Sequence, residues 1–368
     1  MADAADLQSE LKAFKDPRLA RGLVESIREL VPDGGATLME VCGTHTVAIA
    51  RNGIRTLMPE GVRLASGPGC PVCVTSNHDI DKIIALARVE GVTIATFGDM
   101  TRVPGSTSSL LAEQAAGRSV EIVYSPLDAL KLAQENPDRQ IVFVGVGFET
   151  TTPLVAMAVK RAKAAGLENF SVYGAHKNMP GALEVIINDP ELKVDALILP
   201  GHVSTIIGVE PYRFLAEKYG VPGVITGFEP VDVLQGIAMI MRQLHEGRAD
   251  IEIAYSRGVM AEGNPVALAA IDEVFEHAAP PSSTRCAGSP PRSSRPSSIK
   301  DAVAATSCVA SCRRTSARCS ARCARLKTPS ARAWCQAREA ARRTTAITER
   351  AKRCSFARID GTGVNRRN

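Results

Sequence analysis

Between residues 36 and 226 the chain repeats one arrangement: a short apolar run, a turn rich in glycine and polar residues, and a helical segment. The runs are predicted strands, at residues 36–41, 62–65, 92–97, 141–146, 171–174, 195–199 and 221–226. Strands that alternate with helices form parallel sheets that are covered by helices on their faces. The pattern therefore predicts an α/β protein, and a chain of 368 residues is long enough for two or three domains.

Several of these predicted strands are followed directly by polar residues of unusual type. In a parallel sheet, ligands bind outside the carboxyl ends of the strands, because the loops there meet at one edge. Cys42 follows the first strand and is three residues from His45, a pair that can activate a thiol or ligate a metal. The alternative is a buried core cysteine with His45 as a helix cap.

Two further thiols, Cys70 and Cys73, lie in a loop at residues 67–73 that also contains two glycines and two prolines. Proline restricts the backbone and glycine permits unusual turns, so such a loop can hold both sulfur atoms at a defined place. A helical segment follows at residues 79–88, which puts the thiols near a helix N-terminus, where a thiolate is favoured. Cysteines at this spacing can close a disulfide, share a metal or simply pack, and the spacing does not choose among these.

A carboxylate and two histidines follow other predicted strands. Glu149 is a candidate acid, base or ligand, and the alternative is a solvated loop carboxylate. Thr150 opens a segment typical of a helix start, although an anion could also bind there. His202 and His176 are either ligands or structural groups. The sequence contains neither a P-loop nor a Gly-x-Ser-x-Gly hydrolase motif.

The net charge of +5 conceals an acidic body and a basic tail. Residues 281–368 hold 20 of the 44 Lys and Arg residues but 4 of the 39 Asp and Glu residues, so they carry +16 and the rest of the chain −11. Seven of the ten cysteines also lie there: Cys286, Cys308, Cys312, Cys319, Cys323, Cys335 and Cys354. Only this tail favours a nucleic-acid binder, and we expect no nucleic-acid partner.

The start of the chain, from Met1 to Asp6, is acidic and polar and does not resemble a signal peptide. No uninterrupted apolar run is long enough to span a bilayer, so we expect no membrane partner. A cytoplasmic location is the expected default, and cysteines there are more often catalytic or metal-bound than disulfide-bonded. Residues 1–34 are expected to form the N-terminal helices, two short amphipathic ones.

Four motifs in residues 10–278 carry a resemblance to a known family. They are Cys42-Gly43-Thr44-His45-Thr46, Gly67-Pro68-Gly69-Cys70-Pro71-Val72-Cys73, Gly147-Phe148-Glu149-Thr150-Thr151 and Pro200-Gly201-His202-Val203-Ser204. Together they resemble the HypD family of nickel–iron hydrogenase maturation factors. The resemblance implies two similar lobes with parallel sheets flanked by helices, and a third region with a [4Fe–4S] cluster. We assign the lobes to residues 35–117, with the three motif cysteines, and 118–245, and a returning helical segment to 246–278.

The resemblance implies a scaffold that assembles the Fe(CN)2CO group of the nickel–iron site. Cys42 would ligate the iron and share it with a small HypC-like partner, while a HypE-like partner would deliver cyanide. Cys70 and Cys73 would be a redox pair nearby. The other residues of the implied site are His45, Glu149 and His202 for the chemistry and Thr44, Gly69 and Thr150 for cofactor binding. Whether the scaffold is itself an enzyme stays open, and the alternative is a thiol–disulfide oxidoreductase that uses Cys70 and Cys73 without assembling iron.

The cluster ligands expected of the family are not recognisable in this chain. The family pattern stops after Glu276, and the following residues are rich in Arg, Ser, Ala, Pro and Cys without a hydrophobic period, so they cannot build a core. We interpret residues 279–368 as an aberrant basic tail, a frameshifted translation that is irregular and disordered. The alternative is a true basic tail with a cluster or zinc bound by Cys308, Cys312, Cys319 and Cys323.

Overall fold

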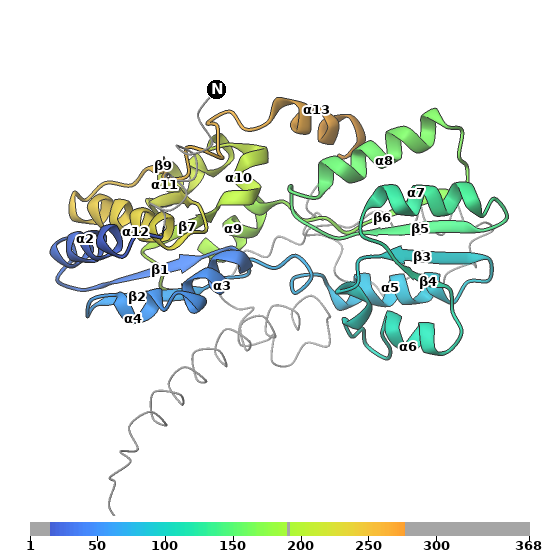
Figure 1. Ribbon diagram of the computed structural model, residues 1–368, viewed down its shortest axis with the longest axis horizontal. Helices are drawn as coiled ribbons and strands as arrows, with labels where there is room; N and C mark the ends of the chain where they lie inside the picture. The colour runs from blue at the N-terminus through green and yellow to red at the C-terminus, as the bar shows by residue number, and fades with distance from the viewer. Residues whose placement is uncertain (1–14, 190–191, 277–368) are drawn as a thin grey trace, which may run out of the picture.

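The structure is a computed structural model that describes residues 15–189 and 192–276. Their strands form two sheets, one of five strands and one of four, and every strand pair is parallel. Figure 1 shows the two sheets side by side, each accompanied by helices. The predicted α/β class with parallel sheets in two lobes is therefore confirmed. No helix of the described residues is long and apolar enough to cross a bilayer.

The first lobe is built on the five-stranded sheet, which has the strand order β2-β1-β7-β8-β9. Its strands are β1 (Ala36–Glu40), β2 (Val62–Ser66), β7 (Ala196–Pro200), β8 (Gly223–Thr226) and β9 (Ile251–Ile253). One face packs against α2 (Pro17–Glu29), α3 (Gly43–Arg51), α4 (Ile54–Leu57) and α12 (Pro230–His245). The other face packs against α9 (Met179–Ile187), α10 (Gly201–Ile207), η2 (Glu210–Tyr212) and α11 (Arg213–Tyr219).

The second lobe is built on the four-stranded sheet, which has the strand order β4-β3-β5-β6. Its strands are β3 (Val92–Thr96), β4 (Val120–Ile122), β5 (Gln140–Gly145) and β6 (Phe170–Gly174). One face packs against α5 (Asn77–Ala87), η1 (Met100–Arg102) and α6 (Leu110–Ala115), and the other against α7 (Pro126–Glu135) and α8 (Thr152–Ala164). The last described helix, α13 (Pro265–Val274), lies along α8 (Figure 1).

Sequence signals explain two central elements of the first lobe. Strand β7 is apolar at every position and buried at every position, as expected for a parallel strand that has helices on both of its faces. Helix α12 begins where Glu229 and Asp232 form a capping box, with Pro230 at the first helical position, where its missing N–H has no cost. The predicted strands therefore lie within a few residues of the observed ones.

The strand pairing corrects the predicted division of the chain into lobes at residues 35–117 and 118–245. Strand β3 pairs with β5 in the second lobe, whereas β1 pairs with β7, which is more than 150 residues away in the sequence. The first lobe is thus discontinuous, and residues 77–174 are inserted into it. The physical reason is that strands with the same apolar composition pair according to the core they jointly bury, which chain order does not reveal.

Two smaller differences concern short strands, and two predictions at the ends lie outside the described residues. The segment at 246–278, predicted as helical, begins with β9 before α13, and β4 was not predicted because it has three residues. Helix α2 corresponds to the second predicted N-terminal helix, and the first lies outside the described residues. The predicted frameshifted tail at 279–368 also lies outside them and stays a prediction.

The chain passes between the lobes at the carboxyl ends of strands. Residues 67–76 lead from β2 to α5, and residues 175–178 lead from β6 back to α9. In Figure 1 the arrowheads of β1 and β3 point toward each other across the junction between the lobes. Both sheets therefore present their ligand-binding edges to this junction.

Replacement of Ile198 tests the discontinuous first lobe. Ile198 is fully buried in β7, between β1 and β8, so Ile198→Ala should lower the free energy of unfolding by about 2–5 kcal/mol through lost burial and a cavity. Urea unfolding followed by circular dichroism measures this difference. Val266→Ala is the control, because Val266 is 79% exposed, and equal stability of the two variants would contradict the assignment.

Candidate functional site

Cys42 lies at the carboxyl edge of the first lobe, between the end of β1 and the start of α3. Its backbone is extended (φ −141°, ψ 125°), which places it at the N-cap position of the helix, and its carbonyl oxygen accepts the N–H of Thr46 at 3.1 Å. The side chain is partly buried and does not cap the helix. The thiol is therefore held at a turn of defined geometry and remains available to a ligand.

Gly69 lies directly against Cys42. The N–H of Gly67 donates to the carbonyl oxygen of Glu40 at 2.7 Å, so the loop after β2 continues alongside β1. The N–H of Gly43 faces the carbonyl oxygen of Gly69 at 3.5 Å. A Cβ atom at Gly69 would be 2.5 Å from the backbone nitrogen of Cys42, which real structures do not tolerate. Glycine at this position thus allows the two cysteine motifs to meet backbone to backbone.

The sulfur atoms of Cys70 and Cys73 are 3.0 Å apart and are not joined by a disulfide. The Cys73 thiol and the Cys73 backbone N–H both donate to the sulfur of Cys70, the latter at 3.4 Å. These hydrogen bonds, the thiol donor foremost, lower the pKa of Cys70 to about 6, whereas the pKa of Cys73 is raised. The pair therefore has one sulfur that readily becomes a thiolate and one that keeps its proton, which is the arrangement of a reactive dithiol.

His45 is fully buried and anchors α3 to β8. Its Nε2 donates to the carbonyl oxygen of Gly227 at 2.9 Å, since a carbonyl can only accept, and is 2.8 Å from the hydroxyl of Thr226. Burial lowers the pKa of His45 to about 4, so the imidazole is neutral. Its Nδ1 is buried without a hydrogen-bond partner among the described residues. His45 therefore links two strand ends of the sheet, and it is not the helix cap considered above.

His202 and His45 both stack on the ring of Phe228. The ring centroids are 4.1 Å apart for His202 and 4.8 Å for His45. His202 is exposed at the start of α10, and partial burial lowers the pKa of its imidazole. Phe228 was not singled out from the sequence, although the Gly-Phe-Glu tripeptide at 147–149 recurs at 227–229 and was the available signal.

Glu149 lies after β5, and one of its carboxylate oxygens is buried without a hydrogen-bond partner in the described part of the chain. Its Oε1 accepts the N–H of Met179 at the start of α9 at 2.9 Å, while Oε2 is buried without a hydrogen bond among the described residues. Burial raises the pKa of Glu149 to about 7, so the carboxyl group exchanges a proton near neutral pH. The hydroxyl of Tyr212 is buried, and burial is the largest cause that raises its pKa. Electrostatic interactions with Glu149 and Cys42 raise this pKa further. Glu149 and Cys42 thus each lie within electrostatic range of Tyr212.

Two other residues of the predicted site are exposed near helix starts, and His176 lies in the second lobe. Thr44 is exposed in the first turn of α3, and Thr150 is exposed just before the α8 N-cap, which is Thr151. His176 lies at the end of β6 against Phe275, with both ring nitrogens buried and unpartnered in the described part of the chain. Burial lowers the pKa of His176 to about 4, and its surroundings are those of the second lobe.

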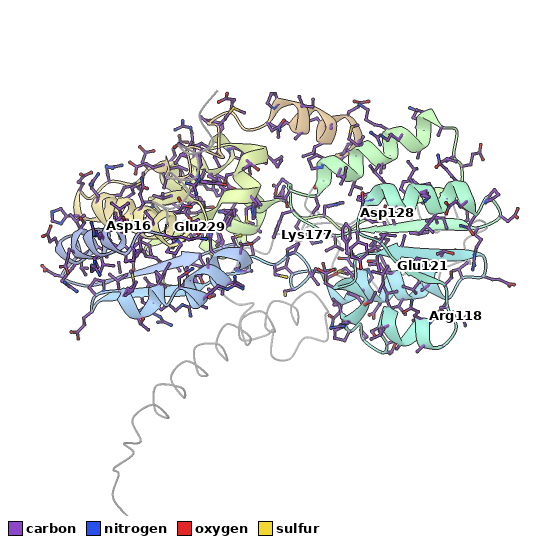
Figure 2. All side chains as sticks on the ribbon, viewed as in Figure 1. Asp16, Arg118, Glu121, Asp128, Lys177 and Glu229 are labelled. Atoms are coloured by element: carbon purple, nitrogen blue, oxygen red, sulfur yellow. The ribbon has the colours of Figure 1, made fainter. Side chains whose placement is uncertain are left out.

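An ion pair that sequence reasoning missed connects the two crossovers. Asp79, in the first turn of α5, is 1% exposed and accepts the hydroxyl of Tyr173 at 3.1 Å and that of Ser76 at 2.7 Å. The Nζ atom of Lys177 is 3.7 Å from the same carboxylate, and Figure 2 shows Lys177 between the lobes. A buried carboxylate needs such partners. The loop that carries Cys70 is therefore tied to the second crossover.

Comparison with known proteins decides the family. A profile described as "HypD: Hydrogenase formation hypA family" matches residues 18–324. The chain belongs to the HypD family. It is 48% identical over 269 residues to the hydrogenase maturation factor HypD of Rhodobacter capsulatus, which covers 72% of this chain and 71% of the relative. It is 43% identical over 268 residues to HypD of Escherichia coli strain K12, which covers 71% of this chain and 72% of the relative.

These HypD relatives support a role in the maturation of hydrogenases. A further relative, the hydrogenase maturation factor HypD of Azotobacter vinelandii, is 48% identical over 270 residues. The described residues contain no group of three or more His, Cys, Asp or Glu side chains that could hold a metal. A [4Fe–4S] cluster therefore has no fitting site in this part of the chain, and the seven C-terminal cysteines lie outside it.

Replacement of Gly69 tests the backbone contact with Cys42. Gly69→Ala should lower the free energy of unfolding by about 1–3 kcal/mol, because the added Cβ forces the loop away from Cys42. Gly174→Ala is the matched control, since nothing lies within 4 Å of a Cβ there. Urea unfolding of both variants measures the difference, and a Gly69→Ala protein as stable as the control would contradict the close approach.

The reactivity of Cys70 should follow a low pKa. Because alkylation requires the thiolate, its rate should rise with pH through a midpoint at about 6. In Cys73→Ala the thiol donor is lost, so the midpoint should move up toward the ordinary cysteine value of about 8.5. Peptide mass spectrometry after timed iodoacetamide labelling measures each cysteine separately. An unchanged midpoint in the variant would refute the assignment of the donor.

Proposed function

We propose that this chain is a scaffold on which the Fe(CN)2CO group of nickel–iron hydrogenases is assembled, together with HypC-like and HypE-like partners. The observation that carries the proposal is the contact between Gly69 and Cys42, which brings the two cysteine motifs to one edge at the lobe junction. Thiolates are soft ligands suited to low-spin iron with cyanide and CO. Membership in the HypD family agrees with this cargo.

In this proposal Cys42 is the iron ligand that the chain supplies. The described residues offer no group of three metal-ligating side chains, so one thiolate from this chain would need further ligands from the cargo itself and from the HypC-like partner. The partly buried position of Cys42 at the start of α3 leaves its sulfur open to such a shared site. A scaffold that must later release its cargo benefits from a single ligand, because few bonds have to be broken.

Cys70 and Cys73 would supply electrons to the cargo. Oxidation of the two thiols to one disulfide releases two electrons and two protons, and the 3.0 Å distance between the sulfur atoms allows closure with a small movement. Glu149 would accept or give a proton in the same region, since its free Oε2 and its pKa of about 7 suit proton transfer. His202 would contact the cargo at the exposed edge, while Thr44, Gly69 and Thr150 would line its path.

A second candidate function is a thiol–disulfide oxidoreductase that uses Cys70 and Cys73 without assembling iron. The lowered pKa of Cys70 favours it, because an activated thiolate is what such enzymes need. Iron retention separates the two functions, since a plain oxidoreductase has no reason to hold iron with a HypC-like partner.

Replacement of Cys42 tests the scaffold. After anaerobic co-purification with a HypC-like partner, the unaltered complex should show infrared bands of cyanide and CO, and the Cys42→Ala complex should lose both bands and its iron. Leu19→Ala, at an exposed position of α2, is the control and should keep them. Circular dichroism checks that Cys42→Ala remains folded. Undiminished bands in that variant would exclude Cys42 as the ligand, and bands absent from every complex would exclude the scaffold.

A further inference from the structure

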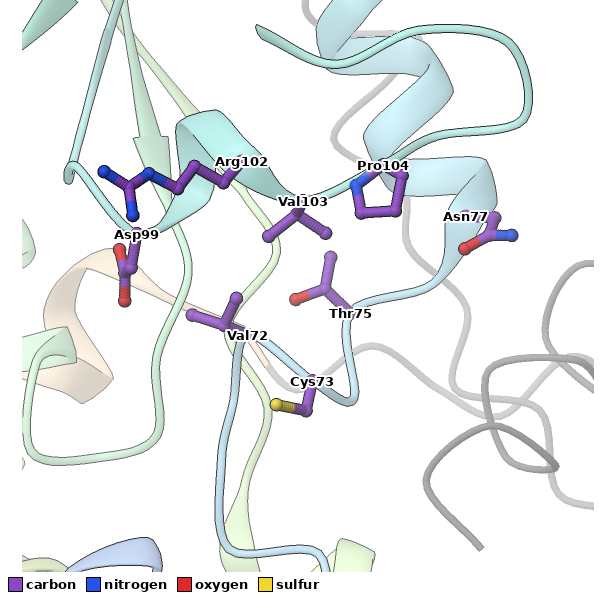
Figure 3. Close-up of a pocket in the computed structure, with 8 residues that line it drawn as sticks. All are labelled: Val72, Cys73, Thr75, Asn77, Asp99, Arg102, Val103 and Pro104. Atoms are coloured by element: carbon purple, nitrogen blue, oxygen red, sulfur yellow. The ribbon is translucent and has the colours of Figure 1, made fainter. Parts of the chain in front are cut away.

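A pocket of about 340 Å³ lies beside the thiol pair, on the side of the second lobe (Figure 3). Cys73 and Val72 line it from the loop after β2, and Asp99, Arg102 and Val103 line it from the loop after β3. Its volume is at the lower end of small-molecule sites, which span about 300–1,000 Å³. The pocket therefore suits a compact ligand that reaches the sulfur of Cys73.

The two charged side chains of this pocket are available to a ligand. Asp99 and Arg102 are both exposed and form no ion pair with each other or with another described residue. Within the described residues, the carboxylate of Asp99 accepts the N–H of Met100 through Oδ1 at 2.9 Å, and its Oδ2 has no hydrogen bond. The guanidinium of Arg102 can bind a carboxylate, and the carboxylate of Asp99 can bind an ammonium. Val72 and Val103 together form an apolar part of the pocket wall. The complementary ligand is a small zwitterion.

The two sulfur atoms differ in a way that defines a direction of attack. Cys73 is exposed and lines the pocket, whereas Cys70 is partly buried and does not line it. In the dithiol form, the sulfur of Cys70 accepts the backbone N–H of Cys73 at 3.4 Å. In the disulfide, an attacking thiolate would reach Cys73, and Cys70 would be the better leaving group because its thiolate is stabilised.

We propose that this pocket binds a low-molecular-weight thiol carrying both a carboxylate and an ammonium, and that this thiol reduces the Cys70–Cys73 disulfide. The inference rests on the proposed redox role of the pair. Arg102 holds the carboxylate of the thiol, and Asp99 holds its ammonium. Free cysteine and a γ-glutamyl thiol such as glutathione share this chemistry.

The reduction proceeds in two exchanges that balance. The bound thiolate attacks the sulfur of Cys73, a new sulfur–sulfur bond forms, and the Cys70–Cys73 bond breaks to leave Cys70 as a thiolate that takes up a proton. A second molecule of the thiol then attacks the sulfur of the first, which releases the small-molecule disulfide and returns Cys73 as a thiol after protonation. Two small thiols are oxidised and one protein disulfide is reduced.

The test measures the rate at which different thiols reduce the disulfide in the full chain. Peptide mass spectrometry after acid quenching and alkylation follows the Cys70–Cys73 peptide. The thiols are cysteine, glutathione, 3-mercaptopropionate with a carboxylate only, cysteamine with an ammonium only, and 2-mercaptoethanol with neither. Each rate is divided by the 2-mercaptoethanol rate of the same variant, which removes changes in the intrinsic reactivity of the disulfide.

Arg102→Gln should lower the normalised rates for cysteine and 3-mercaptopropionate by about tenfold, or about 1.4 kcal/mol, because one charge-assisted hydrogen bond to the carboxylate is lost. Asp99→Asn should lower those for cysteine and cysteamine. The ratio of cysteine to glutathione in the unaltered chain identifies the source. Arg118→Gln is the control, since Arg118 is exposed on the second lobe away from the junction (Figure 2).

The outcomes distinguish a failure of the thiol site from a failure of the redox role of Cys70 and Cys73. Normalised rates that are equal for all thiols, or unchanged in both pocket variants, would overturn the thiol site while the redox role stands. If mild oxidation yields no Cys70–Cys73 disulfide in the unaltered chain, the redox role and the thiol site both fall. Selective loss for charged thiols in Arg102→Gln and Asp99→Asn, with Arg118→Gln unchanged, supports the site.

Discussion

The close approach of Gly69 to the backbone of Cys42 is the constraint on which the site depends. A residue with a Cβ at position 69 would come within 2.5 Å of Cys42, so the loop after β2 keeps its path only with glycine there. The same loop then crosses to α5 in the second lobe. One backbone segment thus brings two cysteine motifs together and connects the lobes. A shift of one lobe relative to the other would therefore displace the thiols.

The ion pair between Lys177 and Asp79 adds a second connection at the same junction. Asp79 is buried, and its oxygens are satisfied by Tyr173, Ser76 and Lys177, which come from three different segments of the chain. Removal of one partner would leave a desolvated charge, which is costly. The arrangement therefore stabilises the start of α5 close to the loop that carries Cys70 and Cys73, and it explains why these thiols can lie in a loop and still have a defined geometry.

Burial and hydrogen bonding act on three polar groups near the edge with different consequences. His45 loses its charge because burial lowers its pKa, and its Nε2 donates to the carbonyl oxygen of Gly227, which makes it a neutral anchor between α3 and β8. Glu149 has a hydrogen bond to only one oxygen among the described residues, and burial raises its pKa into the neutral range and leaves the other oxygen for chemistry. Cys70 is activated by hydrogen bonds and not by burial. Anchoring, proton transfer and nucleophilic reactivity thus arise from the balance between burial and hydrogen bonding at each group.

The sequence by itself determined the positions of most strands, the α/β class and the candidate residues at the strand ends, because apolar runs and turn residues are local signals. It also carried the family motifs that the comparison bore out. The tertiary structure decided which strands pair, and so made the first lobe discontinuous. It also decided that His45 contacts Thr226, 181 residues away, and that Asp99 and Arg102 share a pocket with Cys73. These contacts follow from the joint burial of distant segments, which no local pattern encodes.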